Sequence, residues 1–440
     1  MFLRNGSVVD AAVATLFCNG LVNSQSMGLG GGFLMTLYLH DEKKAITLDA
    51  RESAPLRATH DMYNGTAGLS QEGILAVGVP GELKGYWEAH LKYGRLPWAE
   101  LVRPTIRLCE EGYIMNKHQY DSIGFRPHFI REDPVLRPKK ICETLKLIAR
   151  EGGNVLYNGT VAKTLAADIQ DMGGIITEED LAQYRVKWMD PISVSLRGGL
   201  QLYTVPPPGS GILLGFILNI LEGFNFTAAD LKDVNSTILT YHRMIEAFKF
   251  AYARRAELGD PDFINITNGL FEMAFGAGLT SRNTGIILNS GMDDFSIPGI
   301  DSYFGIPYAP QNAIAPGKRA LSSMCPSIIV DKSGDVRLVI GASGGTKITT
   351  AVAYVIMRHF WFNETIKQAV DAGRIHHQVI PMEVSYEYGI LDQVVKGLEM
   401  LGHETDRYRG RGSIICALAK LKNAIIANAD FRKGGDVYGI

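Results

Sequence analysis

The chain has 440 residues with a formal net charge of −2, of which 46% are hydrophobic and 20% are charged. A chain of this length can bury a sizeable core, so a minimal binding module is excluded. The composition is that of a globular protein, and the near-neutral charge gives no electrostatic reason to expect nucleic acid as a partner. The longest apolar run, residues 211–221, is shorter than the roughly 20 residues that a membrane helix requires, so we expect a soluble chain.

The N-terminal part of the sequence predicts a helix followed by a β-hairpin. Ser7 with Asp10 three residues later forms a capping-box pattern, which predicts a helix that runs to about Leu21. A glycine-rich loop follows this helix. Two β-rich runs, at 33–39 and 45–49, then flank a polar turn, which is typical of a hairpin.

The rest of the chain is predicted to be helical first and then to return to strands. From residue 81 to about 260 the periodicity is mostly helical, most clearly over 237–257. The remaining predicted elements are strands at 327–330 and 336–341, a helix over 346–360, and a hairpin of 413–418 with 424–427. Helices between two sets of hairpins favour an α/β fold, specifically an αββα sandwich of two stacked sheets between helical layers.

Two glycine-rich loops invite a nucleotide-binding interpretation, and neither fits it. Residues 27–32 join a helix to a strand, which reverses the order of a dinucleotide-binding loop, and Phe33 stands where that motif needs glycine. Residues 341–347 do join a strand to a helix, but Thr346 stands where a Walker A loop has glycine. We therefore expect no cofactor.

Three features carry possible chemistry, each with a plainer alternative. The amides of Gly344 and Gly345, at a predicted helix start, could hold a developing oxyanion, or the two residues could form an ordinary tight turn. Arg51, at a strand end, could bind a substrate carboxylate or form a surface ion pair. The two carboxylates in residues 292–295 could bind an ammonium group or a metal, or could be solvated loop charges.

Neither the cysteines nor the histidines predict a metal site. The five cysteines have no CxxC or CxxH spacing, so neither a structural zinc site nor a disulfide scaffold is indicated. The adjacent pair His376 and His377 lacks an acidic partner nearby in the sequence. We expect no metal.

Sequons for N-glycosylation are more frequent than chance placement would give. The seven sequons begin at asparagines 5, 64, 158, 225, 235, 265 and 363. Their excess favours a protein with a secretory history. The alternative is chance combined with asparagines in short turns.

Ten stretches of the sequence occur in the order of a known family. They include NSQSMGLGGG at 23–32, DARESAP at 49–55, YHRMIEAFKFAYARR at 241–255, MDDFS at 292–296 and GASGGT at 341–346. Together they resemble the gamma-glutamyltransferase (glutathione hydrolase) family almost from end to end. The resemblance implies an N-terminal nucleophile hydrolase fold, with a large-subunit-like region 1–267 and a small-subunit-like region 268–440 intertwined in one fold.

The resemblance also implies a reaction, its partners and its site residues. In this family the precursor cuts itself, and the new N-terminal Thr of the small subunit attacks a γ-glutamyl carbonyl. The implied substrates are glutathione and other γ-glutamyl compounds, with amino acids or dipeptides as acceptors, outside the cell or at its surface. The implied site residues are Arg51, Ser322 and Ser323 for the α-carboxylate, Asp294 for the α-ammonium, and Gly344 and Gly345 for the oxyanion.

The chain departs from the family pattern where the nucleophile is expected. The eleven residues 264–274 stand in place of a long family segment that contains the cut site, the Thr and the first small-subunit strands. Thr267 lacks the His that follows the family nucleophile. Gly291 replaces the Glu or Gln that usually precedes Met-Asp-Asp. We therefore expect neither self-cleavage nor turnover from this chain.

Two further gaps point in the same direction. The family's N-terminal anchor and first strand are missing before Met1, so membrane attachment would depend on that missing anchor, and residues 135–138 run abruptly into 139–142. Cys18 corresponds to a family disulfide cysteine whose partner lies in the missing part, so an unpaired thiol is expected. Skipped exons or an incorrect gene model would account for these losses. A genuine noncatalytic paralogue, acting as a binding or decoy partner, would account for them equally well.

Overall fold

The structure is a computed structural model that describes the chain except for residues 67, 124–134, 264–275, 300–304, 306, 409–411 and 440. Helices and strands are interspersed along the chain, which confirms the α/β class. The α-helices are α1 (Val8–Val22), α2 (Gly68–Gln71), α3 (Glu82–Tyr93), α4 (Trp98–Glu111), α5 (Lys117–Ile123), α6 (Lys139–Glu151), α7 (Val155–Asn158), α8 (Thr160–Asp171), α9 (Glu178–Gln183), α10 (Gly211–Glu222), α11 (Val234–Ala253), α12 (Lys347–Phe360), α13 (Ile366–Asp371) and α14 (Asp392–Met400). The strands are β1 (Phe33–Leu39), β2 (Lys44–Ala50), β3 (Tyr113–Ile114), β4 (Val135–Leu136), β5 (Lys187–Met189), β6 (Ile192–Leu196), β7 (Leu200–Thr204), β8 (Ser327–Val330), β9 (Val336–Ser343), β10 (Ile375–His376), β11 (Val384–Tyr386), β12 (Thr405–Arg407), β13 (Ile414–Lys420) and β14 (Ile425–Ala429).

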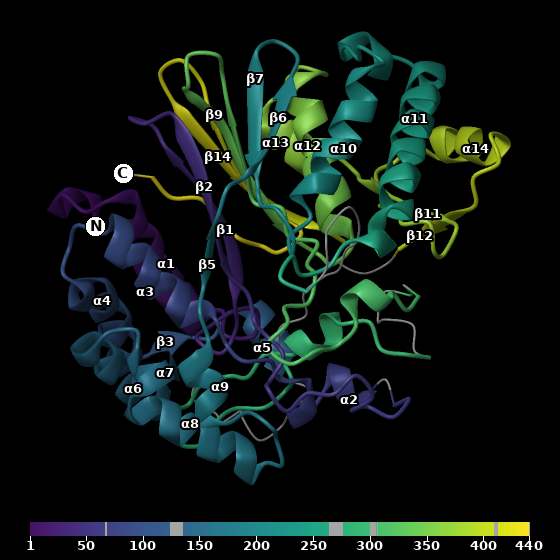
Figure 1. Ribbon diagram of the computed structural model, residues 1–440. Helices are drawn as coiled ribbons and strands as arrows, with labels where there is room; N and C mark the ends of the chain where they lie inside the picture. The colour runs from purple at the N-terminus through teal and green to yellow at the C-terminus, as the bar shows by residue number, and fades with distance from the viewer. Residues whose placement is uncertain are drawn as a thin grey trace.

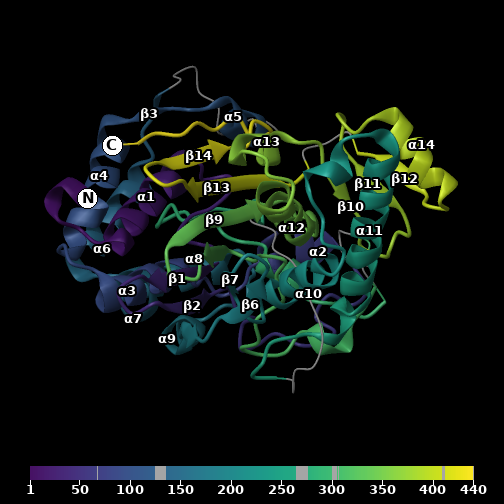
Figure 2. The ribbon, with the colours of Figure 1, turned by 90° about the horizontal axis from the view of Figure 1, so that it is seen from above.

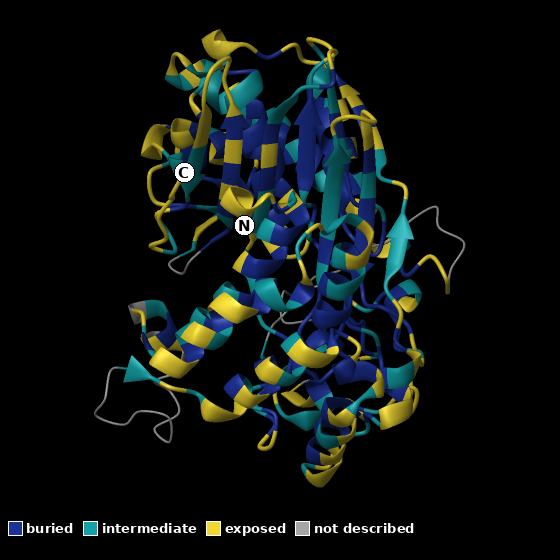
Figure 3. Cartoon of the chain, turned by 90° about the vertical axis from the view of Figure 1, so that its left-hand side faces the viewer, coloured by how far each residue is buried: buried dark blue, intermediate teal, exposed yellow. Residues whose placement is uncertain are grey.

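A six-stranded antiparallel sheet forms the centre of the molecule (Figures 1 and 2), with strand order β14-β13-β9-β8-β7-β6. Helix α10 packs against β6 and β7, and α12 packs against β9 and β13. Side chains from these helices and strands share one buried apolar cluster. Buried residues, dark blue in Figure 3, include all of β8 and alternate with less buried ones along β13. Two of the strands, β6 and β7, come from residues 1–267, and the other four come from 268–440. The two regions therefore share a sheet. The exact boundary between them stays a prediction.

A second sheet, of order β1-β2-β5, lies between the six-stranded sheet and another layer of helices. Successive side chains of a strand point to opposite faces, so β1 can contact a helix on one face and the other sheet on the opposite face. Phe33 stacks on Tyr86 of α3, with ring centroids 5.5 Å apart. Facing the other way, Tyr38 stacks on Tyr203 of β7, with centroids 5.9 Å apart. The described elements are therefore layered as helices, three-stranded sheet, six-stranded sheet and helices.

Several local predictions are confirmed, with small shifts at the element ends. The capping box is present, since Ser7 N donates to Asp10 Oδ2 (2.8 Å) and Asp10 N donates to Ser7 Oγ (3.1 Å). Helix α1 begins directly after it and ends at Val22. The two predicted hairpins, the strands at 327–330 and 336–341 and the helix over 346–360 are also observed.

The prediction of a mostly helical middle region is wrong over residues 187–204, where β5, β6 and β7 lie. The signal was available, because Ile192 to Leu196 alternates apolar and polar residues, and alternation is the strand period. Gly198 and Gly199 follow with φ values of 79° and 75°. Such left-handed residues between two strands are typical of a hairpin turn.

The cysteine spacing did not indicate a disulfide scaffold, but the structure contains one disulfide. Cys109 of α4 and Cys142 of α6 are bonded, with their Cα atoms 5.8 Å apart. The two helices pack against each other, which brings together cysteines that are 33 positions apart in the sequence. Cys18 is a free thiol, as expected.

The sequon asparagines lie on the surface wherever the structure describes them. Asn5, Asn64, Asn225 and Asn363 have φ values of 63°, 42°, 51° and 59°. Asparagine tolerates this left-handed region better than most residues, so turn geometry accounts for these four while their exposure is compatible with glycosylation. Asn265 lies outside the described residues. Among the helices that are described, none is long and apolar enough to cross a bilayer.

Candidate active site

Arg51 lies where β2 ends and is only 1% exposed. Its backbone N–H donates to Asp49 Oδ1 at 2.9 Å. Its Nε donates to the carbonyl oxygen of Ala320 at 2.6 Å, and its Nη2 donates to that of Leu321 at 3.0 Å. The strand end and the segment before β8 thus hold the guanidinium group in one orientation.

Arg51 has two buried ionic partners, Asp294 and, at 3.4 Å from its Nη1, Glu52. Asp294 ends the short 3-10 helix η6 (Gly291–Asp294), is 4% exposed, and accepts a hydrogen bond from Arg51 Nη2 through Oδ2. The pairing leaves neither of these buried charges uncompensated, which would be strongly unfavourable. The sequence placed both residues in one site but did not predict that they contact each other.

Asn312 fixes the loop that carries Asp294, and sequence reasoning missed it. Its Nδ2 donates to the carbonyl oxygen of Asp294 at 2.7 Å, and its Oδ1 accepts from Leu321 N at 3.1 Å. The side chain is fully buried. Asn312 therefore ties the aspartate loop to the segment that carries the two serines, although nothing in the sequence around it marked this role.

Ser322 and Ser323 are fully buried beside a second arginine. Ser322 Oγ accepts from Met324 N at 3.1 Å, and Ser323 Oγ accepts from Arg255 Nη2 at 3.2 Å. Arg255 begins the 3-10 helix η5 (Arg255–Glu257), directly after α11, and is 3% exposed. The sequence analysis assigned it no role, although it ends one of the stretches that carried the family resemblance.

Gly344 and Gly345 form the turn between β9 and α12, with φ values of 126° and 72°. A Cβ on Gly344 would lie 2.6 Å from Ser413 Cα, so both the backbone conformation and the close approach require glycine there. Ile348 N donates to Gly345 O at 2.9 Å at the start of the helix. The predicted turn at a helix N-terminus is confirmed, and its binding of an oxyanion stays a prediction.

Two hydroxyl groups connect this turn to its surroundings. Thr349, in the first turn of α12, donates its Oγ1 to Ser323 O at 3.3 Å. Tyr252 of α11 donates its OH to the carbonyl oxygen of Thr346. The six predicted site residues thus lie within one connected set of elements. The set combines an ion pair, hydroxyl groups and a helix N-terminus, and its binding of a zwitterion and of a developing anion stays a prediction.

Glu52 and Asn289 fill the space beside Gly291. Asn289 Oδ1 accepts from the N–H groups of Gly78 and Gly291, both at 2.8 Å. A Cβ on Gly291 would lie 3.1 Å from both Glu52 Cβ and Asn289 Oδ1. Burial raises the pKa of the Glu52 carboxyl, and neighbouring Arg51 opposes the rise. A longer side chain at position 291 would have to displace these groups.

His376 borders this set, because Gln378 Oε1, which accepts from Thr346 Oγ1 at 2.6 Å, also lies beside its ring, and the ring packs on Tyr252. His376 Nδ1 is 2.8 Å from Thr350 Oγ1, and its Nε2 is 3.0 Å from Gln378 Oε1, so both ring nitrogens are engaged. Thr267 and the rest of 264–274 lie outside the described residues. A cavity of about 630 Å³ borders α5 and residues 276–287, and its lining contains none of the six predicted site residues.

Comparisons with known proteins match the whole chain. The sequence profile of the family described as gamma-glutamyltranspeptidase matches residues 1–272 and 270–440. The two matches meet where the sequence analysis places the missing segment. Scoloptoxin SSD14 from Scolopendra dehaani is 38% identical over 515 aligned positions, which cover 100% of this chain and 89% of the relative. Because that alignment is longer than the chain, the relative carries residues that this chain lacks.

Two further matches concern a plant relative and the fold. Glutathione hydrolase 3 from Arabidopsis thaliana is 35% identical, over 94% of this chain and 77% of the relative. The crystal structure of cephalosporin acylase from Bacillus halodurans superposes with a TM-score of 0.83 at 24% identity, over 98% of this chain and 91% of that one. At that identity the superposition supports the fold alone.

Proposed function

We propose, from the premise that the chain belongs to the gamma-glutamyltranspeptidase family, that it recognises the amino-acid end of glutathione and other γ-glutamyl compounds without cleaving them. The observation that carries this proposal is the buried Arg51–Asp294 pair, with Ser322 and Ser323 in the same network. The family's activity is glutathione hydrolysis and γ-glutamyl transfer to amino acids or dipeptides. We assign to this chain the recognition part of that activity.

The binding argument rests on charge complementarity. A γ-glutamyl group ends in an α-carboxylate and an α-ammonium, which would pair with Arg51 and Asp294 respectively. When the zwitterion enters, the Arg51–Asp294 ion pair is exchanged for two pairs with the ligand, so both charges keep an opposite charge beside them. A ligand with only one of the two charges would compensate only one of these residues, so we expect it to bind less tightly. The hydroxyl groups of Ser322 and Ser323 add donors for the carboxylate.

The proposal that cleavage is lost rests on the sequence. Within 264–274, Thr267 is the sole threonine, and Asn268 follows it instead of histidine. Without an N-terminal Thr the covalent step has no nucleophile, and a retained oxyanion site at Gly344 and Gly345 has no intermediate to stabilise. The chain would also remain in one piece.

An extracellular location is part of the proposal. The Cys109–Cys142 disulfide is of the kind that persists in oxidising compartments, and the exposed sequons are consistent with passage through the secretory route. Glutathione is then the expected ligand, and amino acids or dipeptides the acceptors of an intact relative.

Calorimetric titration of the purified chain with glutathione tests recognition. Binding should weaken at least about tenfold in Arg51→Met and in Asp294→Asn, because each charge-assisted contact contributes roughly 1.5–3 kcal/mol. The control Arg103→Met removes an arginine whose side chain is 58% exposed and should bind like the parent. Equal affinity in all four proteins would refute the proposed recognition.

An insertion tests the proposed loss of cleavage. Placing the family's nucleophile segment between Thr267 and Phe275 should restore glutamate release. In the restored protein, Arg51→Ala or Asp294→Ala should raise KM for glutathione by about ten- to a hundredfold. Unchanged KM in both charge variants would show that these roles are wrongly assigned.

A further inference from the structure

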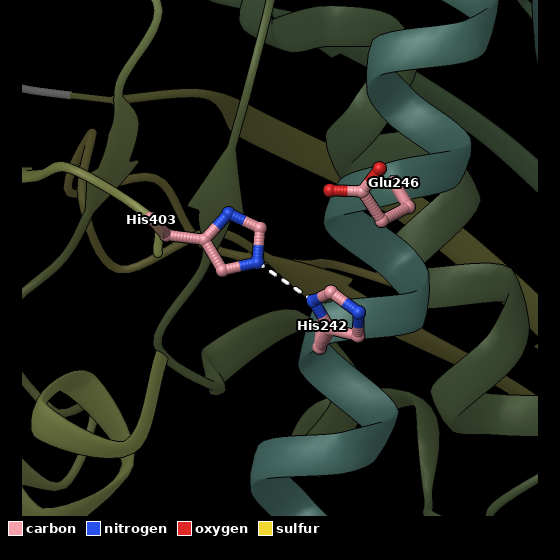
Figure 4. Close-up of side chains that lie close together, drawn as sticks. All are labelled: His242, Glu246 and His403. Carbon is pink, nitrogen blue, oxygen red and sulfur yellow. Dashed lines mark hydrogen bonds between the residues drawn. The ribbon is translucent and has the colours of Figure 1, made fainter. Parts of the chain in front are cut away.

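A cluster of two histidines, a glutamate and a lysine lies between α11 and α14, away from the residues assigned to γ-glutamyl recognition. His242 and Glu246 are four positions apart on α11, so their side chains share one face of the helix. His403 follows α14 and points at them (Figure 4). One potential ligand atom from each of the three lies within 4.8 Å of the other two, and among the described residues no other such group is found.

The backbone holds these side chains in place. Gly397 of α14 packs so closely on α11 that a Cβ would lie 2.2 Å from Ile238 Cδ1. His403 N donates to Leu398 O at 3.1 Å, which anchors the residue to the end of α14. His403 is 6% exposed. The approach of the two helices therefore sets the distance between His403 and the face of α11.

Hydrogen bonds define the tautomers of the cluster when no cation is bound. Lys249 Nζ donates to Glu246 Oε1 at 2.8 Å and lies 3.3 Å from His403 Nδ1. An ammonium group can only donate, so His403 Nδ1 accepts and the ring proton lies on Nε2. His403 Nε2–H then donates to His242 Nδ1 at 2.8 Å. The lysine thus supplies the cluster's positive charge.

We propose that His242, Glu246 and His403 form a binding site for a divalent transition-metal ion, Zn²⁺ in the first instance, which replaces the ammonium group of Lys249. Two imidazoles and a carboxylate are a ligand set that zinc prefers. Zinc–nitrogen bonds of about 2.0–2.1 Å in a tetrahedral site place two ligand nitrogens roughly 3.3 Å apart. The observed 2.8 Å between the imidazoles requires only a small separation of the rings.

The same hydrogen bonds show why metal and lysine would exclude each other. When the ion binds His403 Nε2 and His242 Nδ1, the proton on His403 Nε2 moves to Nδ1, and no proton leaves the cluster. The new Nδ1–H then faces the Lys249 ammonium, a contact between two donors. Glu246 also exchanges its bond to Lys249 for a bond to the metal. The bound ion would tie α14 to α11, and its fourth position would be open to water.

Titration of the EDTA-treated full chain with Co²⁺, followed by Zn²⁺ displacement, tests the site. Cobalt reports tetrahedral coordination through its visible absorption. We expect one Co²⁺ per chain, displaced by one Zn²⁺. His242→Ala and His403→Gln should lose the tetrahedral spectrum. Glu246→Gln should weaken binding about tenfold or more, by analogy with the 10–100-fold losses seen when groups around a metal are removed.

Lys249→Met should increase the affinity for Co²⁺ about tenfold, because it removes the competing cation. A misfolded variant would not show such an increase. The matched control His40→Ala removes an exposed histidine that also lies beside a carboxylate, 3.3 Å from Asp335, and should leave binding unchanged. The proposal is overturned if the protein takes up no Co²⁺, if uptake survives in His242→Ala and His403→Gln, or if Lys249→Met binds no more tightly than the parent.

Discussion

The residues around Arg51 and the histidines beside α11 bury polar groups in two different ways. Arg51 and Asp294 form an ion pair in which each residue is less than 5% exposed. The histidines are instead buried in the neutral state. Burial, with a contribution from Lys347, lowers the pKa of His376 to about 3, and burial with neighbouring Lys249 lowers the pKa of His377 and of His403 to about 4.

This difference determines what each region responds to. When one charge of a buried ion pair is removed, the other charge is poorly compensated. Such a pair therefore suits recognition of a ligand that carries both charges, as a zwitterion does. A buried neutral histidine can instead take up a cation, either a proton or a metal ion. We therefore expect the first region to select for ligand charge and the second to respond to pH and to metal ions.

The largest expected effect follows from breaking the fixed pair on one side only. Asp294→Ala should lower the free energy of unfolding by about 3 kcal/mol, because Arg51 loses its shorter ion pair and keeps only the 3.4 Å contact with Glu52. The double variant Arg51→Met/Asp294→Leu should lose less, since both charges of the shorter ion pair are removed together. Urea denaturation monitored by circular dichroism measures both.

A surface pair provides the control. Lys396 and Asp392 form an i,i+4 pair at 68% and 75% side-chain exposure. Removing either partner should change the free energy of unfolding by no more than about 0.5 kcal/mol. Equal losses from the single and double variants of the Arg51 pair would contradict the description of it as mutual compensation.

A comparable effect is expected from His376. Its pKa is about 3 when folded and near 6.5 when unfolded, so between these values the unfolded state binds more protons. The stability of the chain should therefore fall as the pH is lowered through this window. His376→Gln keeps an acceptor and a donor but cannot titrate, so it should lose about 3 kcal/mol less than the parent between pH 7 and pH 4.

Urea denaturation at the two pH values measures this difference. The exposed His40→Gln serves as the control and should follow the parent at both pH values. Parallel losses in the parent and in His376→Gln would show that the buried histidine does not carry the acid sensitivity.

The smallest of the expected effects separates positioning from charge. Asn312→Ala removes the two hydrogen bonds that join the Asp294 loop to Leu321 and should cost about 2 kcal/mol of unfolding free energy. Glutathione should also bind less tightly, although both charges remain. Asn235→Ala, at an exposed position, should stay within about 0.5 kcal/mol of the parent. If glutathione affinity is unchanged in Asn312→Ala, Asn312 has no positioning role.

Much of the local structure could be predicted from neighbouring residues. The capping box at Ser7 marks the start of α1, and the β-rich run at 33–39 marks β1, because both signals depend on residues a few positions apart. The hairpin of β6 and β7 carried the same kind of signal and was overlooked within a region that otherwise has helical periodicity.

Contacts between distant residues were less accessible. The resemblance placed Arg51 and Asp294 in one site, but their direct pairing depends on how a strand end and a loop 243 positions later meet. Cys109 and Cys142 are brought together by the packing of two helices, and His403 reaches His242 only because α14 lies on α11. No local pattern encodes such contacts.

The central claim is that the chain recognises γ-glutamyl compounds without cleaving them. The most direct test measures glutathione binding and glutamate release in one sample. The purified 440-residue chain is incubated with glutathione, bound ligand is counted after rapid dialysis, and free glutamate is measured over time. We expect saturable binding with no glutamate above the buffer control. Release of more than one glutamate per chain, abolished by Thr267→Ala, would contradict this account.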